Sequence, residues 1–324
     1  MDANKKVVIL SRSFGKATDE PLKYLQENGL DVTLLRNDQP EDVEYIARQI
    51  GDADAVITGS DVINRYVIDR CPNLKIVSKH GVGLDSIDLE LAEERGIAVT
   101  KTPDANNESV ADLTILLLLA ILRNLRANLI TSSTPDWKAK PLSNDLYEKT
   151  VGLVGYGKIG IAVAKRLEGF NCTLLVYDPA VGQGDIQTRN TTLVSVEELL
   201  QKSDVVSLHT PLNESTYHMI GKRELEKMKD GAILLNTSRG ALVDEKALYD
   251  ALTSGKLRGA GLDVFSVEPP VEEPLLTLPN VVATPHIAPH TAEANYRMGM
   301  AAARNVVEHF KKREHRRESV LTGR

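Results

Sequence analysis

The feature that most constrains the fold is a glycine-rich turn in the middle of the chain. Residues 150–154, Thr-Val-Gly-Leu-Val, have the apolar composition of a buried strand. Gly155, Gly157 and Gly160 follow directly in the spacing G-x-G-x-x-G, and a helical pattern then leads to a second apolar strand that ends at Asp178. Strand, turn, helix, strand and acid in this order predict a βαβ unit of a parallel sheet.

Each part of this turn suits a dinucleotide. Gly155 permits the sharp turn, Gly157 lets the backbone approach a pyrophosphate, and Gly160 lets helix and strand pack closely. The N–H groups and the dipole at the helix start favour phosphates. Asp178 can accept hydrogen bonds from the adenosine ribose and would repel a 2′-phosphate, so the motif predicts NAD rather than NADP. The alternative, a glycine-rich turn with no ligand, explains neither the order of the elements nor the acid.

Short apolar segments alternate with helical segments through most of the 324 residues. This alternation predicts an α/β protein with parallel strands and right-handed crossovers. At about 150 residues per domain, the length predicts two domains. The composition becomes polar near residue 104, where we place the start of an NAD-binding domain at 104–288. Residues 1–103 then belong to the other domain.

Composition narrows the possible partners. The formal net charge of −6 gives no electrostatic reason to expect nucleic acid. The longest apolar run, Leu113 to Leu122, is shorter than the roughly 20 residues that cross a bilayer, so we expect no membrane partner. The polar start of the chain predicts no signal peptide. Cys71 and Cys172 stand far apart and in no metal-binding spacing, which indicates no metal site and a reducing, cytoplasmic setting.

A second loop with glycines follows the strand predicted at 74–78. It reads His80-Gly81-Val82-Gly83, and its glycines leave backbone N–H groups unblocked by side chains. Loops at the carboxyl ends of parallel strands bind ligands in open sheets, and free amides would suit a carboxylate. A tight strand-to-helix turn without a ligand explains the two glycines equally well.

Three ionisable residues follow apolar strands in the second half of the chain: Arg239, Glu268 and His286. A histidine ionises near neutral pH and suits proton transfer, and a guanidinium matches a carboxylate or carbonyl oxygen. A carboxylate beside an imidazole fixes its tautomer and favours the protonated ring. Together they would serve the oxidation of a C–OH group. Singly, each has an ordinary structural interpretation: a helix cap or ion pair, a surface turn, and a packed loop histidine.

These motifs resemble those of the D-isomer-specific 2-hydroxyacid dehydrogenases over nearly the whole chain, and most nearly the phosphoglycerate- and hydroxypyruvate-type members. The likeness lies in residues 79–85, 151–160, 236–240, 263–269 and 284–291. It implies two Rossmann-like, doubly wound parallel-sheet domains with a cleft between them. The substrate domain would be discontinuous, comprising 1–103 plus 289–324. The resemblance also implies a homodimer formed through a long helix from about Glu108 to Asn128.

The resemblance implies a role for each candidate residue. Arg239 would hold and polarise the substrate, Glu268 would pair with the histidine, and His286 would be the acid and base. Lys79 and the amides of Val82 and Gly83 would bind the substrate, together with Arg239 and His286. Contacts with NAD are implied for Gly155, Gly157, Lys158, Ile159, Gly160, Asp178, His209, Thr210, Pro211, Thr216, Thr237, Ser238, Arg239, Asp263 and His286.

The implied reaction is hydride transfer between NAD and a small D-2-hydroxy or 2-oxo acid, such as glycerate, hydroxypyruvate or phosphoglycerate. Phosphoglycerate enzymes often carry an arginine where this chain has Gly59 and Ser60, and Lys79 and His80 are candidates for the missing positive charge. One alternative on the same fold is a nucleotide-sensing, corepressor-like interaction protein. Another is a formate- or phosphite-type dehydrogenase, although formate enzymes replace the carboxylate that Glu268 provides.

Overall fold

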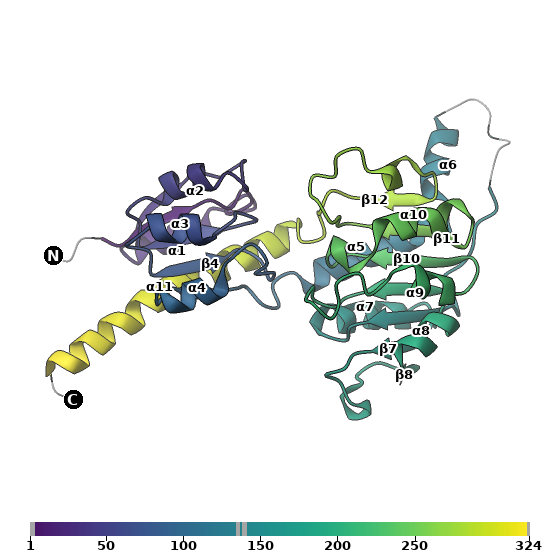
Figure 1. Cartoon of the computed structure of the whole chain (residues 1–324). Helices are drawn as coiled ribbons and strands as arrows, with labels where there is room; N and C mark the ends of the chain where they lie inside the picture. Colours follow the sequence, from purple (N-terminus) through teal and green to yellow (C-terminus); the bar gives the residue numbers. More distant parts are fainter. Residues whose placement is uncertain (1–3, 134–136, 138–140, 323–324) are drawn as a thin grey trace. The chain divides into compact units, whose positions relative to one another are not determined.

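The computed structural model describes residues 4–133, 137 and 141–322, with side chains to residue 312. The chain divides into two compact units, one of residues 1–106 with 290–324 and one of residues 107–289 (Figure 1). Each unit is built around its own parallel sheet. The domain boundaries expected from the sequence, 103/104 and 288/289, stay predictions.

The first unit contains a five-stranded sheet in the order β2-β1-β3-β4-β5, with every pairing parallel. Its strands are β1 (Lys6–Ile9), β2 (Asp31–Leu34), β3 (Ala55–Thr58), β4 (Ile76–Lys79) and β5 (Ala98–Thr100). Its helices are α1 (Glu20–Glu27), α2 (Val43–Ile50), α3 (Arg65–Arg70), α4 (Leu89–Glu94) and α11 (Ala292–Thr322). The strand order reverses between β1 and β3, so the carboxyl ends of these two strands flank a topological switch point.

Successive residues of a strand point to opposite faces of this sheet. Val7 of β1 lies in a core that includes Val306 of α11, whereas Val8 lies in a second core that includes Ile46 of α2. Polar side chains begin several of the helices: Asp42 accepts a hydrogen bond from the backbone N–H of Tyr45 at the start of α2, as an N-cap does. Helices therefore cover both faces, as the alternating pattern predicts.

The second unit contains a seven-stranded parallel sheet in the order β12-β11-β10-β9-β6-β7-β8. Its strands are β6 (Thr150–Val154), β7 (Thr173–Tyr177), β8 (Thr191–Leu193), β9 (Val205–Leu208), β10 (Ala232–Asn236), β11 (Leu257–Leu262) and β12 (Val281–Ala283). Its helices are α5 (Asn107–Leu122), α6 (Leu125–Ser132), α7 (Lys158–Glu168), α8 (Val196–Lys202), α9 (Lys222–Lys227) and α10 (Glu245–Thr253). Here the order reverses between β6 and β9. The doubly wound fold class predicted from the sequence is confirmed for both sheets.

Two cores sandwich this second sheet. Leu153 of β6 packs in the core that contains Leu117 of α5, and its neighbour Val154 packs in the core that contains Leu199 of α8. The carboxyl ends of the strands are thus fixed from both sides, and these ends carry the candidate site residues.

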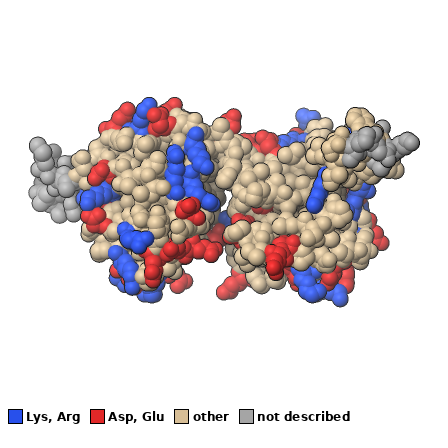
Figure 2. Space-filling view, turned by 90° about the horizontal axis from the view of Figure 1, so that it is seen from above, with Lys and Arg blue, Asp and Glu red and all other residues tan. Residues whose placement is uncertain are grey.

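On the surface of each unit, lysine and arginine side chains lie among acidic ones (Figure 2).

The single long helix predicted from Glu108 to Asn128 is wrong. The structure has two helices, α5 and α6, that meet at a bend of 66°. Asn124 stands at the break with φ of 48°, a left-handed conformation that asparagine tolerates better than most residues. Its Nδ2 donates to the Leu142 carbonyl and to the Ser143 hydroxyl, which fixes the bend.

Among the described helices, none alone is both long and apolar enough to cross a bilayer. Only α5 and α6 taken together reach that length and composition, across their bend. Much of α5 is core, since Leu113, Leu117 and Leu118 are all buried.

Candidate active site

The glycine turn between β6 and α7 is shaped by close backbone contacts. Gly155 has φ of +99°, and a Cβ there would lie 2.6 Å from the His209 carbonyl oxygen at the end of β9. A Cβ on Gly160 would overlap the Gly155 carbonyl. A Cβ on Gly157 would meet nothing within 4 Å, so the space in front of that residue is open. The turn is therefore packed behind Gly155 and Gly160 and open at Gly157.

The open side of the turn is the start of α7. Gly157 is the N-cap of this helix, and Lys158 and Ile159 are its first residues. N–H groups in the first turn of a helix have no acceptor within the helix, and they attract phosphate oxygens. The open Gly157 and these donors fit the pyrophosphate of a dinucleotide.

Asp178 follows β7 and faces the same turn. Its Oδ2 accepts a hydrogen bond from the Tyr156 N–H at 2.8 Å, and its Oδ1 accepts one from the Ala180 N–H at 2.9 Å. The carboxylate is half-exposed, and each oxygen keeps a second lone pair for a ribose hydroxyl. This arrangement fits the adenosine half of NAD and disfavours a 2′-phosphate.

His209 lies behind the glycine turn. Its Nε2 lies 2.9 Å from the Ser207 hydroxyl, and its buried Nδ1 has no hydrogen-bond partner among the described residues. Burial lowers the pKa of His209 to about 4, so the ring is neutral at pH 7. The sequence predicts a cofactor contact here, and the ring also supports the turn itself, because Gly155 and Gly160 pack near it.

Three of the side-chain hydroxyls predicted to contact the cofactor already have protein partners. Ser238 donates to the Thr210 carbonyl at 2.6 Å. Thr216 donates to the Pro211 carbonyl at 2.8 Å and accepts from a backbone N–H. Thr237 is buried, and its hydroxyl lies 3.0 Å from that of a threonine in α5. These side chains shape the loops after β9 and β10, and contact with a cofactor remains a prediction for each.

The loop after β10 carries Arg239. Asn236 fixes the loop, because its Nδ2 donates to the Arg239 carbonyl at 2.8 Å. A Cβ on Gly240 would overlap the backbone of Phe265, so this loop lies directly against the one after β11. Nη1 of Arg239 donates to the Ser238 carbonyl at 2.6 Å, and the guanidinium also acts electrostatically on Glu268.

Asp263, at the end of β11, organises the loop that carries His286. Its Oδ1 accepts hydrogen bonds from the Thr284 hydroxyl at 2.6 Å and the Ile287 N–H at 2.9 Å. Its Oδ2 accepts from the Ala288 N–H at 2.9 Å, and its carbonyl accepts from the His286 N–H at 2.9 Å. The sequence predicts a cofactor contact for this carboxylate, but the structure shows it fully buried and engaged with the histidine loop.

The structure brings His286 and Glu268 together. Nδ1 of His286 lies 2.7 Å from Oε2 of Glu268, and Oε1 of Glu268 accepts from the Phe265 N–H at 3.0 Å. The His286 side chain is 44% exposed, and no described residue is hydrogen-bonded to its Nε2. His286 has φ of 52°, a backbone conformation that non-glycine residues rarely adopt. One ring nitrogen is therefore held by a carboxylate while the other faces outward.

Glu268 is held in its ionised form. Partial burial opposes ionisation, but the hydrogen bond and charge of His286, the Phe265 N–H and the charge of Arg239 together lower the pKa of Glu268. An ionised Glu268 stabilises the protonated imidazole of His286. All three predicted catalytic residues thus belong to one electrostatic group at the carboxyl ends of the strands.

The loop after β4, in the first unit, presents free amides. Gly81 has φ of +156°, and its carbonyl accepts hydrogen bonds from the backbone and the hydroxyl of Thr102. The N–H groups of Val82 and Gly83 have no partner among the described residues, and both residues are partly exposed. Two neighbouring free N–H groups fit a carboxylate.

The structure separates the two residues that the sequence suggests for a positive charge, and for Lys79 that role stays a prediction. Nζ of Lys79 is hydrogen-bonded to the Ser86 hydroxyl at 3.2 Å, and the residue is 9% exposed. His80 is buried, and burial lowers its pKa to about 4. That expectation is therefore wrong for His80, since its ring is neutral at pH 7.

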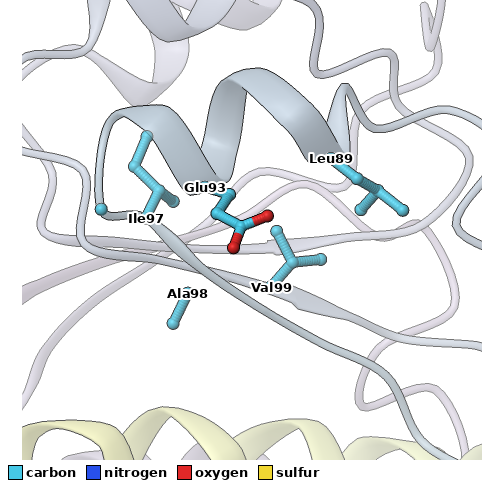
Figure 3. Close-up of a pocket in the computed structure, with 6 residues that line it drawn as sticks. Leu89, Glu93, Ile97, Ala98 and Val99 are labelled. Carbon is cyan, nitrogen blue, oxygen red and sulfur yellow. The ribbon is translucent and has the colours of Figure 1, made fainter.

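A hollow elsewhere in the first unit lacks such chemistry. It lies between α4 and β5, where apolar side chains surround Glu93 (Figure 3). Glu93 is the one ionisable residue among those that line it. In the described residues no three histidine, cysteine, aspartate or glutamate side chains gather in a metal-binding group.

Comparison with known proteins agrees with this geometry. The family sequence model for the NAD binding domain of D-isomer specific 2-hydroxyacid dehydrogenases matches residues 115–288 of this chain. A hydroxypyruvate reductase of Thermotoga maritima is 44% identical over 249 residues, 76% of this chain and 80% of the relative. A glyoxylate reductase of Korarchaeum cryptofilum is 41% identical over 295 residues, 89% of each chain.

A D-3-phosphoglycerate dehydrogenase of Methanocaldococcus jannaschii is 41% identical over 291 residues, which are 89% of this chain but 55% of that one. The chain therefore spans about half the length of this relative. Among solved structures, the TT0316 protein of Thermus thermophilus superposes with a TM-score of 0.86 at 40% identity, covering 95% of this chain and 97% of that one. The chain belongs to the D-isomer-specific 2-hydroxyacid dehydrogenase family and is an NAD-dependent oxidoreductase.

Proposed function

We propose that this protein transfers a hydride between NAD and C2 of a small D-2-hydroxy acid or the matching 2-oxo acid, in the range of glycerate, hydroxypyruvate and phosphoglycerate. The relatives are named for hydroxypyruvate, glyoxylate and phosphoglycerate, and this spread supports the class of acid but not one member. The observation that carries the proposal is the 2.7 Å contact between His286 Nδ1 and Glu268 Oε2, with Nε2 left open.

Each residue has a defined task in this reaction. His286 accepts the hydroxyl proton at Nε2 when the alcohol is oxidised and returns it when the oxo acid is reduced. Glu268 stabilises the protonated ring between these events. Arg239 binds the substrate oxygens through its planar guanidinium, and the Val82 and Gly83 amides bind the carboxylate. NAD, when bound at Gly157, accepts or supplies the hydride.

The test is a panel of acids assayed by nicotinamide absorbance. Purified protein is given NADH with glyoxylate, hydroxypyruvate, pyruvate or phosphohydroxypyruvate, and NAD with the achiral glycolate or with the D and L forms of the three other hydroxy acids. We expect turnover with at least one oxo acid and with the D form only. Tight NADH binding without turnover of any acid would instead favour an interaction protein that senses nucleotide.

We also propose a homodimer formed through α5 and α6. Large apolar side chains stand exposed on these helices: Leu116 at 56%, Leu129 at 61% and Ile130 at 64%. Exposed apolar surface of this kind marks interaction sites. Light scattering after gel filtration should give twice the 35.5 kDa chain mass, and L129E with I130E should shift it to the monomer. A monomeric wild-type protein would contradict this proposal.

The cysteines support a reducing, cytoplasmic setting, which we propose for the protein. Cys71 and Cys172 are both free and buried, and burial raises the pKa of each thiol to about 11. Thiols with such a pKa are unreactive structural groups. Cell fractionation, followed by detection of the protein with an antibody, would test whether it lies in the cytoplasm.

A further inference from the structure

The loop after β1, residues 11–17, stands at the switch point of the first sheet. β1 and β3 are neighbours, and the chain leaves them in opposite directions to β2 and β4. Ligands bind in the crevice outside the carboxyl ends of strands at such a point. Gly59 follows β3 and packs against the base of the loop, since a Cβ there would lie 3.3 Å from the Ser11 hydroxyl. The loop is therefore placed where the fold favours a ligand.

His80 connects this loop to the segment that carries the free amides of Val82 and Gly83. Its Nδ1 lies 3.1 Å from the Ser11 hydroxyl and 3.3 Å from the Ser13 hydroxyl. His80 directly precedes Gly81, and the free N–H of Val82 is two residues on. Two Cα steps span at most about 8 Å of chain, so Val82 cannot lie far from the loop.

The loop is fixed on its other side as well. Nδ2 of Asn295 in α11 donates to the Ser13 carbonyl at 2.5 Å, and Oδ1 accepts from the Ala17 N–H at 3.1 Å. Phe14 is fully buried, and its ring packs edge-on against His80 with 5.6 Å between centroids. The backbone that carries residue 12 is thus anchored by both neighbours of that residue.

Arg12 is the residue that this loop presents. It is exposed, it lies between the two serines that bind His80, and no described residue pairs with its guanidinium. Arg95, another exposed arginine of this unit, is by contrast paired with Asp69 at 2.6 Å. An arginine with five donors and no acceptor, held on an anchored loop, is ready for an oxyanion.

The charges around this loop favour an anion there. His80 is neutral, and Arg12 is an exposed positive charge on the loop segment that His80 contacts. The buried carboxylate of Asp61, after β3, accepts hydrogen bonds from Thr58, Gly59 and Asn37. Its oxygens are directed into these loops and do not pair with Arg12.

We propose that Arg12 binds a second anionic group of the substrate, a phosphate ester or a second carboxylate, while the Val82 and Gly83 amides bind the C1 carboxylate. This inference rests on the proposed function for the C1 end of the acid. Arg12 would then determine which acids of that class the protein prefers. The substrate is then a 2-hydroxy acid with an oxyanion at its far end.

The test compares R12A, R12K and the wild-type protein on D-glycerate, 3-phosphoglycerate and D-malate, with K16A as the matched control from the same loop. Loss of a charge-assisted contact should lower the ratio of kcat/KM for the charged acid over D-glycerate by about 10- to 100-fold in R12A. R12K should retain part of the preference, and K16A should leave it unchanged. Which charged acid responds identifies the phosphate or the carboxylate.

Calorimetric titration of 3-phosphoglycerate and D-malate into the NADH-bound proteins separates this inference from the proposed function. One outcome would be that wild type binds one of these acids tightly, that R12A binds it about 10-fold more weakly, and that no acid turns over. Arg12 would then bind the second anionic group as proposed, whereas the proposed reaction would be contradicted. An R12A protein with wild-type affinity and an unchanged kcat/KM ratio would overturn the inference, and so would a K16A effect as large as that of R12A.

Discussion

Two of the histidines that follow parallel strands in this protein, His286 and His80, have opposite environments. His286, beyond β12, has Nδ1 on a carboxylate and Nε2 open to ligands. His80, beyond β4, has Nδ1 on two serine hydroxyls and is buried. The first ring is equipped to gain and lose a proton. The second is held neutral, with a pKa of about 4.

The difference lies in what each loop packs against. The second unit surrounds its histidine with carboxylates, Glu268 on the ring and Asp263 on the backbone. The first unit surrounds its histidine with hydroxyls and an aromatic ring. Position at a strand end makes a histidine available for chemistry, and the charge and burial of its neighbours decide whether it performs any.

Replacing His286 should give the largest effect. H286A removes the acid and base, and turnover should fall by about 100- to 10,000-fold. NADH affinity, measured by fluorescence, and the urea midpoint should change little because the ring is exposed. Turnover within a fewfold of wild type would show that another group moves the proton.

Replacing His80 should instead alter stability and its dependence on pH. The unfolded ring has a pKa of 6.5 and the folded ring about 4, so the unfolded chain binds more protons between these values. The free energy of unfolding therefore falls as pH drops from 6.5 to 4, by about 3 kcal/mol for this residue. H80Q should remove that component. Urea titrations at about pH 4.5 and pH 7 span most of the interval between the two pKa values, so their difference measures this component.

His209 provides the control for this experiment. Its pKa is also lowered to about 4 by burial, so it contributes a similar loss of stability on acidification. H80Q should consequently reduce the pH dependence without abolishing it. A pH dependence in H80Q equal to that of wild type would mean that His80 is not held neutral.

Replacing Glu268 tests the charge partner of the catalytic ring. E268Q keeps a hydrogen-bond acceptor but removes the charge, so the protonated imidazole loses the charge that stabilises it. Turnover of the oxo acid should slow by about tenfold, because a charge-assisted hydrogen bond is about twice as strong as a neutral one. E268D, which keeps the charge, should lose less. An E268D protein as slow as E268Q would point to lost packing.

Removing one of the two serine hydroxyls that contact His80 should give the smallest effect on stability. S11A deletes the 3.1 Å contact with Nδ1 and leaves Ser13 as a partner. A single neutral hydrogen bond contributes about 1 kcal/mol, and the urea midpoint should report a loss of that order. An S11A protein as unstable as H80Q would mean that the whole loop had detached.

Much of the fold follows from local patterns. Most strands of both sheets and the three glycines of the turn were predictable because period, strand length and glycine geometry are properties of short segments. The three-residue strands β5 and β8 were not predicted. The break at Asn124 was missed, since the left-handed conformation depends on contacts with Leu142 and Ser143 some distance along the chain. Helix ends likewise depend on tertiary packing.

The site was predictable for residues whose chemistry is rare and less so for those that support them. Arg239, Glu268 and His286 follow apolar strands and resemble a family motif, and the structure brings them together. Asp263 was expected to contact the cofactor, and its engagement with the His286 loop follows from three backbone and side-chain donors that only the fold assembles. The serines around His80 have no sequence pattern of their own.

The discontinuity of the first unit has a consequence for how the protein is made. Its core joins Val7 and Ile9 of β1 to Ala302, Val306 and Phe310 of α11, whereas residues 107–289 form a unit from one continuous stretch. Because chains emerge from the ribosome in order, the second unit can close while the first still lacks a wall of its core. The N-terminal hundred residues, though synthesised before the second unit, must wait for α11, the last described helix, before their core is complete.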